Sequence, residues 1–333
     1  MNRVVGAATA LAAMLLAPAT AAQESNPADA RAVLRRMART ESATYRARQL
    51  VVYFGTPQSA AVLDVRSSAA GRSVRAESGE DVTRLWRKAG IGIVSSGRAT
   101  MSDTSLPAVA LRPSDILAKY EVQMERSERL FGLDILRLVL VRRSDRAATE
   151  RLWVDPESGF VYRRELYGAG GKLVGLSAIL DMRWGGAADA EPMERAVEPS
   201  RVTESDASDA PRMLPNGYRL LGTYRIRTPQ APAEHWVYSD GMHALSIFRT
   251  NGSMRTPAGF EQTTLDGSRA WTGPGPGTWA WEGGGRSWVV VAEEPALDAA
   301  KLTEQLPKGG PSVWSRLGSV WARAFRVVGG LFN

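Results

Sequence analysis

The sequence predicts a mainly β protein with a few helices (α+β), arranged as two domains. Its 333 residues are enough for two ordinary domains, and 44% hydrophobic with 23% charged residues is typical of a globular chain. Many short runs with a period of two follow one another, and the composition changes at Gly185. These observations favour a curved antiparallel sheet or half-barrel, followed by a linker and a smaller β-rich domain.

The first 22 residues are typical of a secretory signal peptide. Arg3 supplies a positive start, residues 4–16 are apolar, and cleavage sites of small residues end at Ala21 and Ala22. The apolar run is too short for a spanning helix, which favours a removable signal over an N-terminal anchor. The chain has no cysteine, so disulfides, thiol chemistry and a lipid anchor on cysteine are excluded.

The first domain is predicted over residues 23–184. A helix is expected at 26–40, because Val33, Leu34 and Met37 share one side of it. From Thr44 the period changes to two, which indicates a half-buried strand. Further strands are predicted at 61–65, 73–76, 83–88, 91–95, 122–126, 135–142, 150–154, 161–166 and 173–181, with a short helix at 113–120.

Residues 185–211 are predicted to be a linker, because they are rich in Ala, Glu, Asp, Ser and Pro. The second domain is predicted over 212–308. It contains a hairpin at 235–248, strands at 278–281 and 286–292, and a short helix at 298–305. Seven of the ten tryptophans lie after residue 210, so the second domain is expected to be small and rich in aromatic residues.

The hairpin holds both histidines of the chain, His235 and His243. A hydrolase would need one of these histidines as the base, Asp240 to orient that histidine, and Ser239 as the nucleophile. Adjacent strand residues point to opposite sides, and Ser-Asp-Gly is what a tight turn requires, so a structural hairpin is favoured. We therefore predict no catalytic residues and no enzyme.

No metal or cofactor is predicted either. The two histidines are eight residues apart without an evident third ligand. The segment 273–277, Gly-Pro-Gly-Pro-Gly, lacks the ending of a phosphate loop, and its prolines remove the amide donors that a phosphate would need. An exposed loop is the simpler interpretation.

Several motifs resemble one family. The turn Trp-Val-Asp-Pro-Glu-Ser-Gly at 153–159 resembles the sheet shared by the LolA and LolB lipoprotein carriers and the N-terminal domain of the MucB/RseB family. The hairpin at 235–248 is similar to that family's second-domain motif. Pro-Asn-Gly-Tyr at 215–218 and Val-Val-Ala-Glu-Glu-Pro at 290–295 also resemble it, with Ala292 where glycine is usual.

The resemblance implies a lipoprotein-carrier type of first sheet and a periplasmic protein. It implies a negative regulator of an envelope-stress sigma factor that binds the periplasmic domain of a membrane anti-sigma factor. Lipid, lipopolysaccharide or misfolded envelope components would be the sensed ligands. The alternative is a periplasmic lipid or lipoprotein carrier that uses only the cavity of the first domain. Whether the chain forms a homo-oligomer is left open.

Residues 309–333 are predicted to form a basic amphipathic tail, which suits a membrane surface or a partner groove. Packing on the second domain is the other interpretation. Despite the net charge of +7, no long basic block is present, so nucleic acid is not an expected partner. Candidate partner-binding residues are His235, Trp236, Tyr238, Trp314, Trp321, Phe325 and Arg323.

We predict that export removes the first 21 or 22 residues. Small residues precede the cut and the polar run Gln-Glu-Ser follows it. N-terminal sequencing of the exported protein should begin at Ala22 or Gln23. Exported protein that still begins at Met1 would contradict the prediction.

Overall fold

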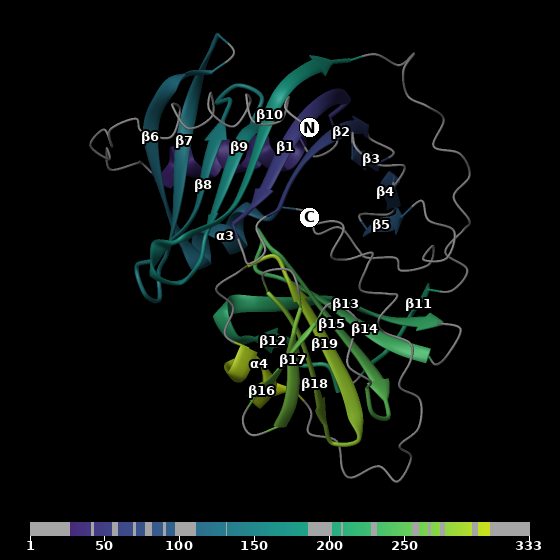
Figure 1. The fold of residues 1–333 in the computed structure, drawn as a ribbon. Helices are drawn as coiled ribbons and strands as arrows, with labels where there is room; N and C mark the ends of the chain where they lie inside the picture. The colour runs from purple at the N-terminus through teal and green to yellow at the C-terminus, as the bar shows by residue number, and fades with distance from the viewer. Residues whose placement is uncertain are drawn as a thin grey trace.

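The structure is a computed structural model that describes residues 27–40, 43–54, 59–68, 71–76, 82–88, 91–96, 111–130, 132–185, 202–207, 209–227, 232–254, 260–265, 268–273, 277–294 and 299–306. It has two open antiparallel sheets, one in each domain (Figure 1). The mainly β fold class with a few helices is therefore confirmed. The predicted signal peptide and the tail at 309–333 lie outside the described residues.

The first sheet has ten strands in the order β5-β4-β3-β2-β1-β10-β9-β8-β7-β6. Because β1 pairs with both β2 and β10, the first and last strands of the domain meet in the middle of the sheet. The elements are α2 (Pro27–Thr40), β1 (Tyr45–Tyr53), β2 (Ser59–Ser68), β3 (Gly71–Ala76), β4 (Val82–Lys88), β5 (Ile91–Ser96), α3 (Pro113–Lys119), β6 (Tyr120–Leu130), β7 (Leu133–Arg142), β8 (Ala148–Val154), β9 (Val161–Tyr167), the short 3-10 helix η1 (Ala169–Gly171) and β10 (Leu173–Trp184).

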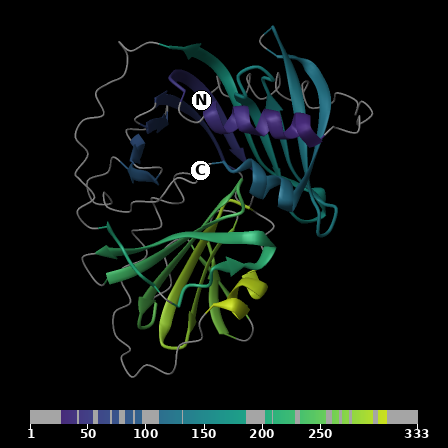
Figure 2. The ribbon, with the colours of Figure 1, turned by 180° about the vertical axis from the view of Figure 1, so that it is seen from behind.

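Helix α2 covers one face of this sheet, and Figure 2 shows it lying across the strands. Its buried side, which includes Val33 and Leu34, packs with Ile116 of α3 against apolar side chains of β6, β7 and β8. The helical spacing in the sequence thus identified the correct buried side. The core formed here supports α3 and the start of β6, where the second domain makes contact.

The motif at 153–159 forms the turn between β8 and β9, and the geometry of this turn accounts for its Asp and Gly. The carboxylate of Asp155 accepts hydrogen bonds from the backbone amides of Glu157 (3.0 Å) and Ser158 (3.3 Å). Gly159 follows with φ +80°, and a Cβ placed there would lie 2.3 Å from the carbonyl carbon of Arg36 in α2. The carboxylate of Asp155 therefore holds the turn that brings the sheet close to the helix.

The second sheet has nine strands, eight of them in the order β11-β13-β14-β15-β19-β18-β17-β16, with β12 paired to β13. The elements are β11 (Val202–Glu204), β12 (Met213–Leu214), the 3-10 helix η2 (Pro215–Gly217), β13 (Tyr218–Arg227), β14 (Pro232–Ser239), β15 (Ala244–Asn251), β16 (Glu261–Leu265), β17 (Ser268–Thr272), β18 (Thr278–Gly283), β19 (Arg286–Ala292) and α4 (Ala299–Gln305).

The core of the second domain contains several of the tryptophans that make this part of the sequence rich in aromatic residues. Trp236 meets Trp288 edge-on with ring centroids 5.5 Å apart, and Trp281 stacks on Trp288 at 6.0 Å. Leu302 of α4 joins the same cluster. Each domain therefore has a core of its own.

Most predicted elements are present with ends shifted by a few residues. The predicted linker 185–211 differs, because β11 lies inside it and pairs with β13. Asp209 also forms an ion pair with Arg249, and Ala210 is buried. A three-residue strand in a stretch rich in small and acidic residues has too few apolar positions to show a period. None of the described helices is long and apolar enough to cross a membrane.

We predict that Gly159→Ala destabilises the first domain by about 1–3 kcal/mol, because the new methyl group meets the backbone of α2 at a positive φ. Gly170→Ala is the matched control, since Gly170 has φ +69° and a methyl group added there would have nothing within 4 Å. Denaturant unfolding should show the larger loss for Gly159→Ala. Equal losses in the two variants would refute the close contact.

Candidate functional site

The tip of the β14–β15 hairpin, residues 240–243, lies against the first domain. The backbone amide of Arg112, just before α3, donates to the carbonyl of Gly241 at 2.8 Å. Gly241 has φ +93°, and a Cβ there would lie 2.7 Å from Cβ of Asp115. A glycine is required at the tip for both reasons.

The tip is held in shape by its own side chains. Oγ of Ser239 accepts from the amide of Gly241 at 2.9 Å. Oδ1 of Asp240 accepts from the amides of Met242 (2.9 Å) and His243 (2.7 Å). The side chain of Met242 packs against the apolar cluster under α2 and α3, so a second-domain residue completes the packing of a first-domain core.

His243 lies between two carboxylates that belong to different domains. Its Nδ1 is 3.2 Å from Oδ2 of Asp240, and its Nε2 is 3.3 Å from Oε2 of Glu150 on β8. All three side chains are at most 1% exposed. Burial alone would lower the pKa of His243, but the charge of Asp240 and the contacts with both carboxylates raise it to about 10. His243 is therefore protonated at neutral pH.

The pKa values of the two carboxyl groups are lowered, whereas that of His243 is raised. Burial opposes the charge of Asp240, but His243 and Lys119 lower the pKa of this carboxyl well below its usual range. Burial likewise opposes the charge of Glu150, and the guanidinium of Arg164, which forms an ion pair with it, together with His243, lowers its pKa. Both carboxyl groups are therefore ionised at neutral pH.

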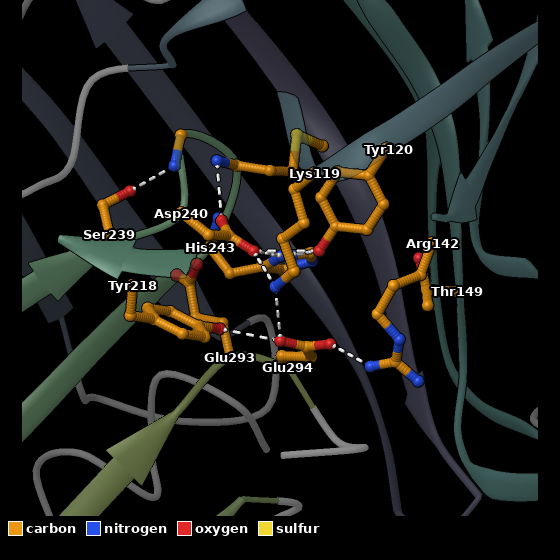
Figure 3. A network of polar contacts seen from close by, with 12 residues as sticks. Lys119, Tyr120, Arg142, Thr149, Tyr218, Ser239, Asp240, His243, Glu293 and Glu294 are labelled. Atoms are coloured by element: carbon orange, nitrogen blue, oxygen red, sulfur yellow. Dashed lines mark hydrogen bonds and ion pairs between the residues drawn. The ribbon is translucent and has the colours of Figure 1, made fainter. Parts of the chain in front are cut away.

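Lys119, the last residue of α3, forms a second link between the domains (Figure 3). Its Nζ donates to Oδ2 of Asp240 at 2.5 Å and to Oε2 of Glu294 at 2.9 Å. It also lies 5.0 Å from the ring centroid of Tyr120 and 4.7 Å from that of Tyr218, which come from different domains. The cation is thus surrounded by groups that favour its charge.

Two tyrosines donate into the same network. The hydroxyl of Tyr120 donates to Oδ2 of Asp240 at 2.9 Å, and that of Tyr218 donates to Oε2 of Glu294 at 3.1 Å. Burial and the nearby carboxylates raise the pKa of Tyr120 and of Tyr218 far above the usual value. Both hydroxyls therefore keep the proton that they donate.

Glu294, just after β19, makes a third link. Its Oε1 accepts from Arg142 of β7 at 2.6 Å, and Arg142 also contacts Asp145 at 2.8 Å. The neighbouring Glu293 accepts from the amide of Ala244 at 2.8 Å, which fixes the end of β19 beside the hairpin tip. Figure 3 shows Arg142 of the first domain and Glu293 and Glu294 of the second domain near one another.

The charges of this site balance only when His243 is protonated. The ion-paired cations are Lys119, Arg142, Arg164 and His243, and the ion-paired carboxylates are Asp145, Glu150, Asp240 and Glu294. Loss of the imidazole proton would leave one buried carboxylate without compensation, which is expensive in a low-dielectric interior. The arrangement is suited to holding two domains together. We call it the interdomain site.

The structure separates the two histidines that the sequence placed together. His235 is fully buried, stacks on Phe248 with centroids 4.3 Å apart, and has a pKa lowered by burial to about 3. Trp236 and Tyr238 are fully buried as well. In this conformation a partner could not contact these three candidates, because each is part of the interior. Trp314, Trp321, Phe325 and Arg323 lie outside the described residues.

The Asp240–His243 pair resembles part of a hydrolase triad, but its surroundings differ. Both ring nitrogens of His243 face carboxylates, so neither is left to take a proton from Ser239. The oxygen of Ser239 instead accepts from the turn backbone. Among the described residues, no group of three or more His, Cys, Asp or Glu side chains is arranged to hold a metal ion.

The sequence did not identify the first-domain half of the interdomain site, which consists of Lys119, Tyr120, Arg142, Glu150 and Arg164. One signal was present, since Glu150 shares the parity of Leu152 and Val154 on β8, whose side chains are buried. A carboxylate on the apolar side of a strand needs a buried partner. The identity of that partner depends on how the domains meet.

No protein-family model matches the sequence, and no curated protein matches it at a significant level. Solved structures do match. A crystal structure of MucB aligns with a TM-score of 0.55 and 18% identity, covering 84% of this chain and 96% of that chain. A chain of the Pseudomonas aeruginosa MucA/MucB complex aligns with a TM-score of 0.55 and 16% identity, covering 86% of this chain and 100% of that chain.

The class defined by the structure is therefore a two-domain, mainly β protein with a polar interdomain site. Within that class, the chain has a MucB-like fold, as the motifs of both domains predicted. A LolA superfamily protein from Nitrosomonas europaea also aligns, over 48% of this chain and 95% of that one, with 13% identity and a TM-score of 0.25.

We predict that stability falls as the pH rises from about 6.5 to about 10. The pKa of His243 is about 10 in the folded chain, and its ordinary value is 6.5. The contribution of this group to the free energy of unfolding is therefore complete below pH 6.5 and decreases as the pH rises to about 10. Breaking a buried pair of this kind costs about 3–5 kcal/mol. Thermal unfolding across this range measures the loss.

His243→Gln is the control for this prediction, because glutamine does not titrate. The variant should be less stable at pH 6.5, and its melting temperature should depend less on pH up to 10. If the melting temperatures of the wild type and the variant change equally with pH, His243 is not the titrating group. At the acid end, the lowered pKa values of Asp240 and Glu150 place the loss below about pH 4.

Proposed function

We propose that the chain is a periplasmic negative regulator of an envelope-stress sigma factor, which acts by binding the periplasmic domain of a membrane anti-sigma factor. The observation that carries the proposal is the fold shared with MucB, which extends over 84% of this chain and so includes both domains. One of the matched structures is a complex of MucB with MucA. A MucA-like protein is therefore the expected partner.

The second domain favours a regulator over a carrier. A lipid or lipoprotein carrier would need only a cavity in the first domain, whereas here a second domain with its own core is attached to it. In the regulator, lipid, lipopolysaccharide or a misfolded envelope component would displace the anti-sigma factor. That is linkage between two ligands of one protein.

The periplasmic location is supported by the signal peptide predicted for residues 1–22. The tail at 309–333, with Trp314, Trp321, Phe325 and Arg323, is assigned to a membrane surface or a partner groove on its composition. The buried His235, Trp236 and Tyr238 would affect partner binding only by keeping the second sheet in shape.

We also propose that the chain is a binding protein and not an enzyme. His243 is the one histidine near an acid and a serine in the described part of the chain, and its ring is occupied by two carboxylates. His235 is uncharged and sealed in the interior. Neither is placed to act as a general base.

The proposal predicts direct binding of the anti-sigma factor encoded beside the gene for this chain. Isothermal titration of the full mature protein with that factor's periplasmic domain should show saturable binding, with a dissociation constant of about 1 μM or tighter. The same domain with its residue order scrambled is the control and should give no signal.

Absence of binding at about 100 μM of the periplasmic domain would contradict the proposal. Binding of acyl lipids without binding of the periplasmic domain would favour the carrier instead.

A further inference from the structure

The contacts described between the two domains converge on one small area. From the second domain come the hairpin tip and the end of β19, with Asp240, Met242, His243 and Glu294. They meet α3, the start of β6 and the strands β7 and β8. The backbone bond from Arg112 to Gly241 lies at the edge of this area. The hairpin tip thus works as a projection that enters the other domain.

We propose that the hairpin tip is a releasable ionic latch: His243, at ion-pairing distance from one carboxylate of each domain, holds the domains in one orientation, and breaking this bridge frees them to turn while each keeps its fold. The inference goes beyond the proposed function and does not depend on it. It would hold for a carrier as well as for a regulator.

The position of His243 makes it the centre of the latch. Asp240 belongs to its own hairpin, whereas Glu150 belongs to the first domain, so the ring joins the two domains through its two nitrogens. A doubly protonated ring donates on both sides, and a neutral ring donates on one only. Glu150 has Arg164 as its other partner, which comes from its own domain. Within this set of contacts, only the imidazole connects Glu150 to the second domain.

The composition of the interface makes release feasible. Apart from Met242, the described contacts between the domains are made by charged groups, tyrosine rings and hydroxyls, and the backbone. Once separated, water can solvate these groups, and little apolar area is exposed. Most of each core lies away from the contact, one around Trp236 and Trp288 and the other around Leu34 and Leu138. Opening the latch removes Met242 from the first-domain core and leaves the remaining packing of each domain within that domain.

The latch can be tested on the full chain by measuring interdomain distance. The natural chain has no cysteine, so Lys172→Cys and Thr263→Cys would supply one exposed spin-label site on each domain. With His243 and Glu150 intact, pulsed electron resonance should give one narrow distance peak. In Glu150→Gln and His243→Gln the peak should broaden or shift.

Hydrogen exchange of the Arg112 amide provides a second readout, because this amide bonds to Gly241 across the interface. In both latch variants its exchange should be faster by about tenfold or more. Amides in the β7–β8 and β15–β19 ladders should keep their protection. That combination distinguishes release of the latch from unfolding of a domain.

Each latch variant has a matched control. Glu165→Gln removes a buried carboxylate on β9 that pairs with Arg163, away from the interface. His235→Phe replaces the other buried histidine, which stacks on Phe248 in the second domain. Both controls should keep the narrow distance peak and slow exchange at Arg112, even where they lower stability.

The proposal is overturned if Glu150→Gln leaves both the distance peak and the Arg112 exchange unchanged. It is also overturned if the two controls change them as much as the latch variants do. If His243→Gln unfolds the second domain, Glu150→Gln still tests the latch. That substitution lies in the first domain and leaves the contact between His243 and Asp240 in place.

Discussion

A protonated imidazole between two carboxylates is the interaction on which the relation of the two domains depends. His243 can hold Asp240 and Glu150 together only while it carries a proton on both nitrogens. The buried carboxylates in turn keep that proton in place and raise the pKa to about 10. The three groups therefore stabilise one another's charges, and removing one leaves an uncompensated charge in the interior.

The rest of the site supports this bridge. Lys119 and Arg142 extend the contact to Glu294, and Tyr120 completes the hydrogen bonding of Asp240. Buried ionic interfaces add less stability than apolar ones, but they demand one geometry. A protein with a MucB-like fold, whose proposed work is to bind one partner and release it to another signal, is served by an interface that is specific and yet can open.

The sequence predicted the helices and strands far better than the contacts between the two domains. The alternation of apolar and polar residues located the strands, and the helical spacing of Val33 and Leu34 identified the buried side of α2, because both patterns reflect local packing. The Ser-Asp-Gly tip was also recognised, and Gly241 has the positive φ that such a turn needs. The motifs at 153–159 and 235–248 led to the correct fold.

What the sequence could not show depends on long-range contacts. Glu150 and His243 are 93 positions apart, and no local pattern relates them. His235 and His243 belong to one hairpin, yet His235 lies within β14 and is buried without a charged partner, whereas His243 lies in the tip between two acids. Trp236 and Tyr238 were candidates for a partner surface because of their residue types, but the sheet turns them into the core.

A double-mutant cycle between Glu150 and His243 tests the central claim most directly. The free energy of unfolding would be measured for the wild type, Glu150→Gln, His243→Gln and the double variant, with Glu165→Gln and His235→Phe as a distant reference cycle. If the imidazole bridges the domains, the first pair should show a coupling of about 1.5 kcal/mol or more, and the reference pair should be additive. Additivity within about 0.5 kcal/mol for Glu150 and His243 would contradict the account.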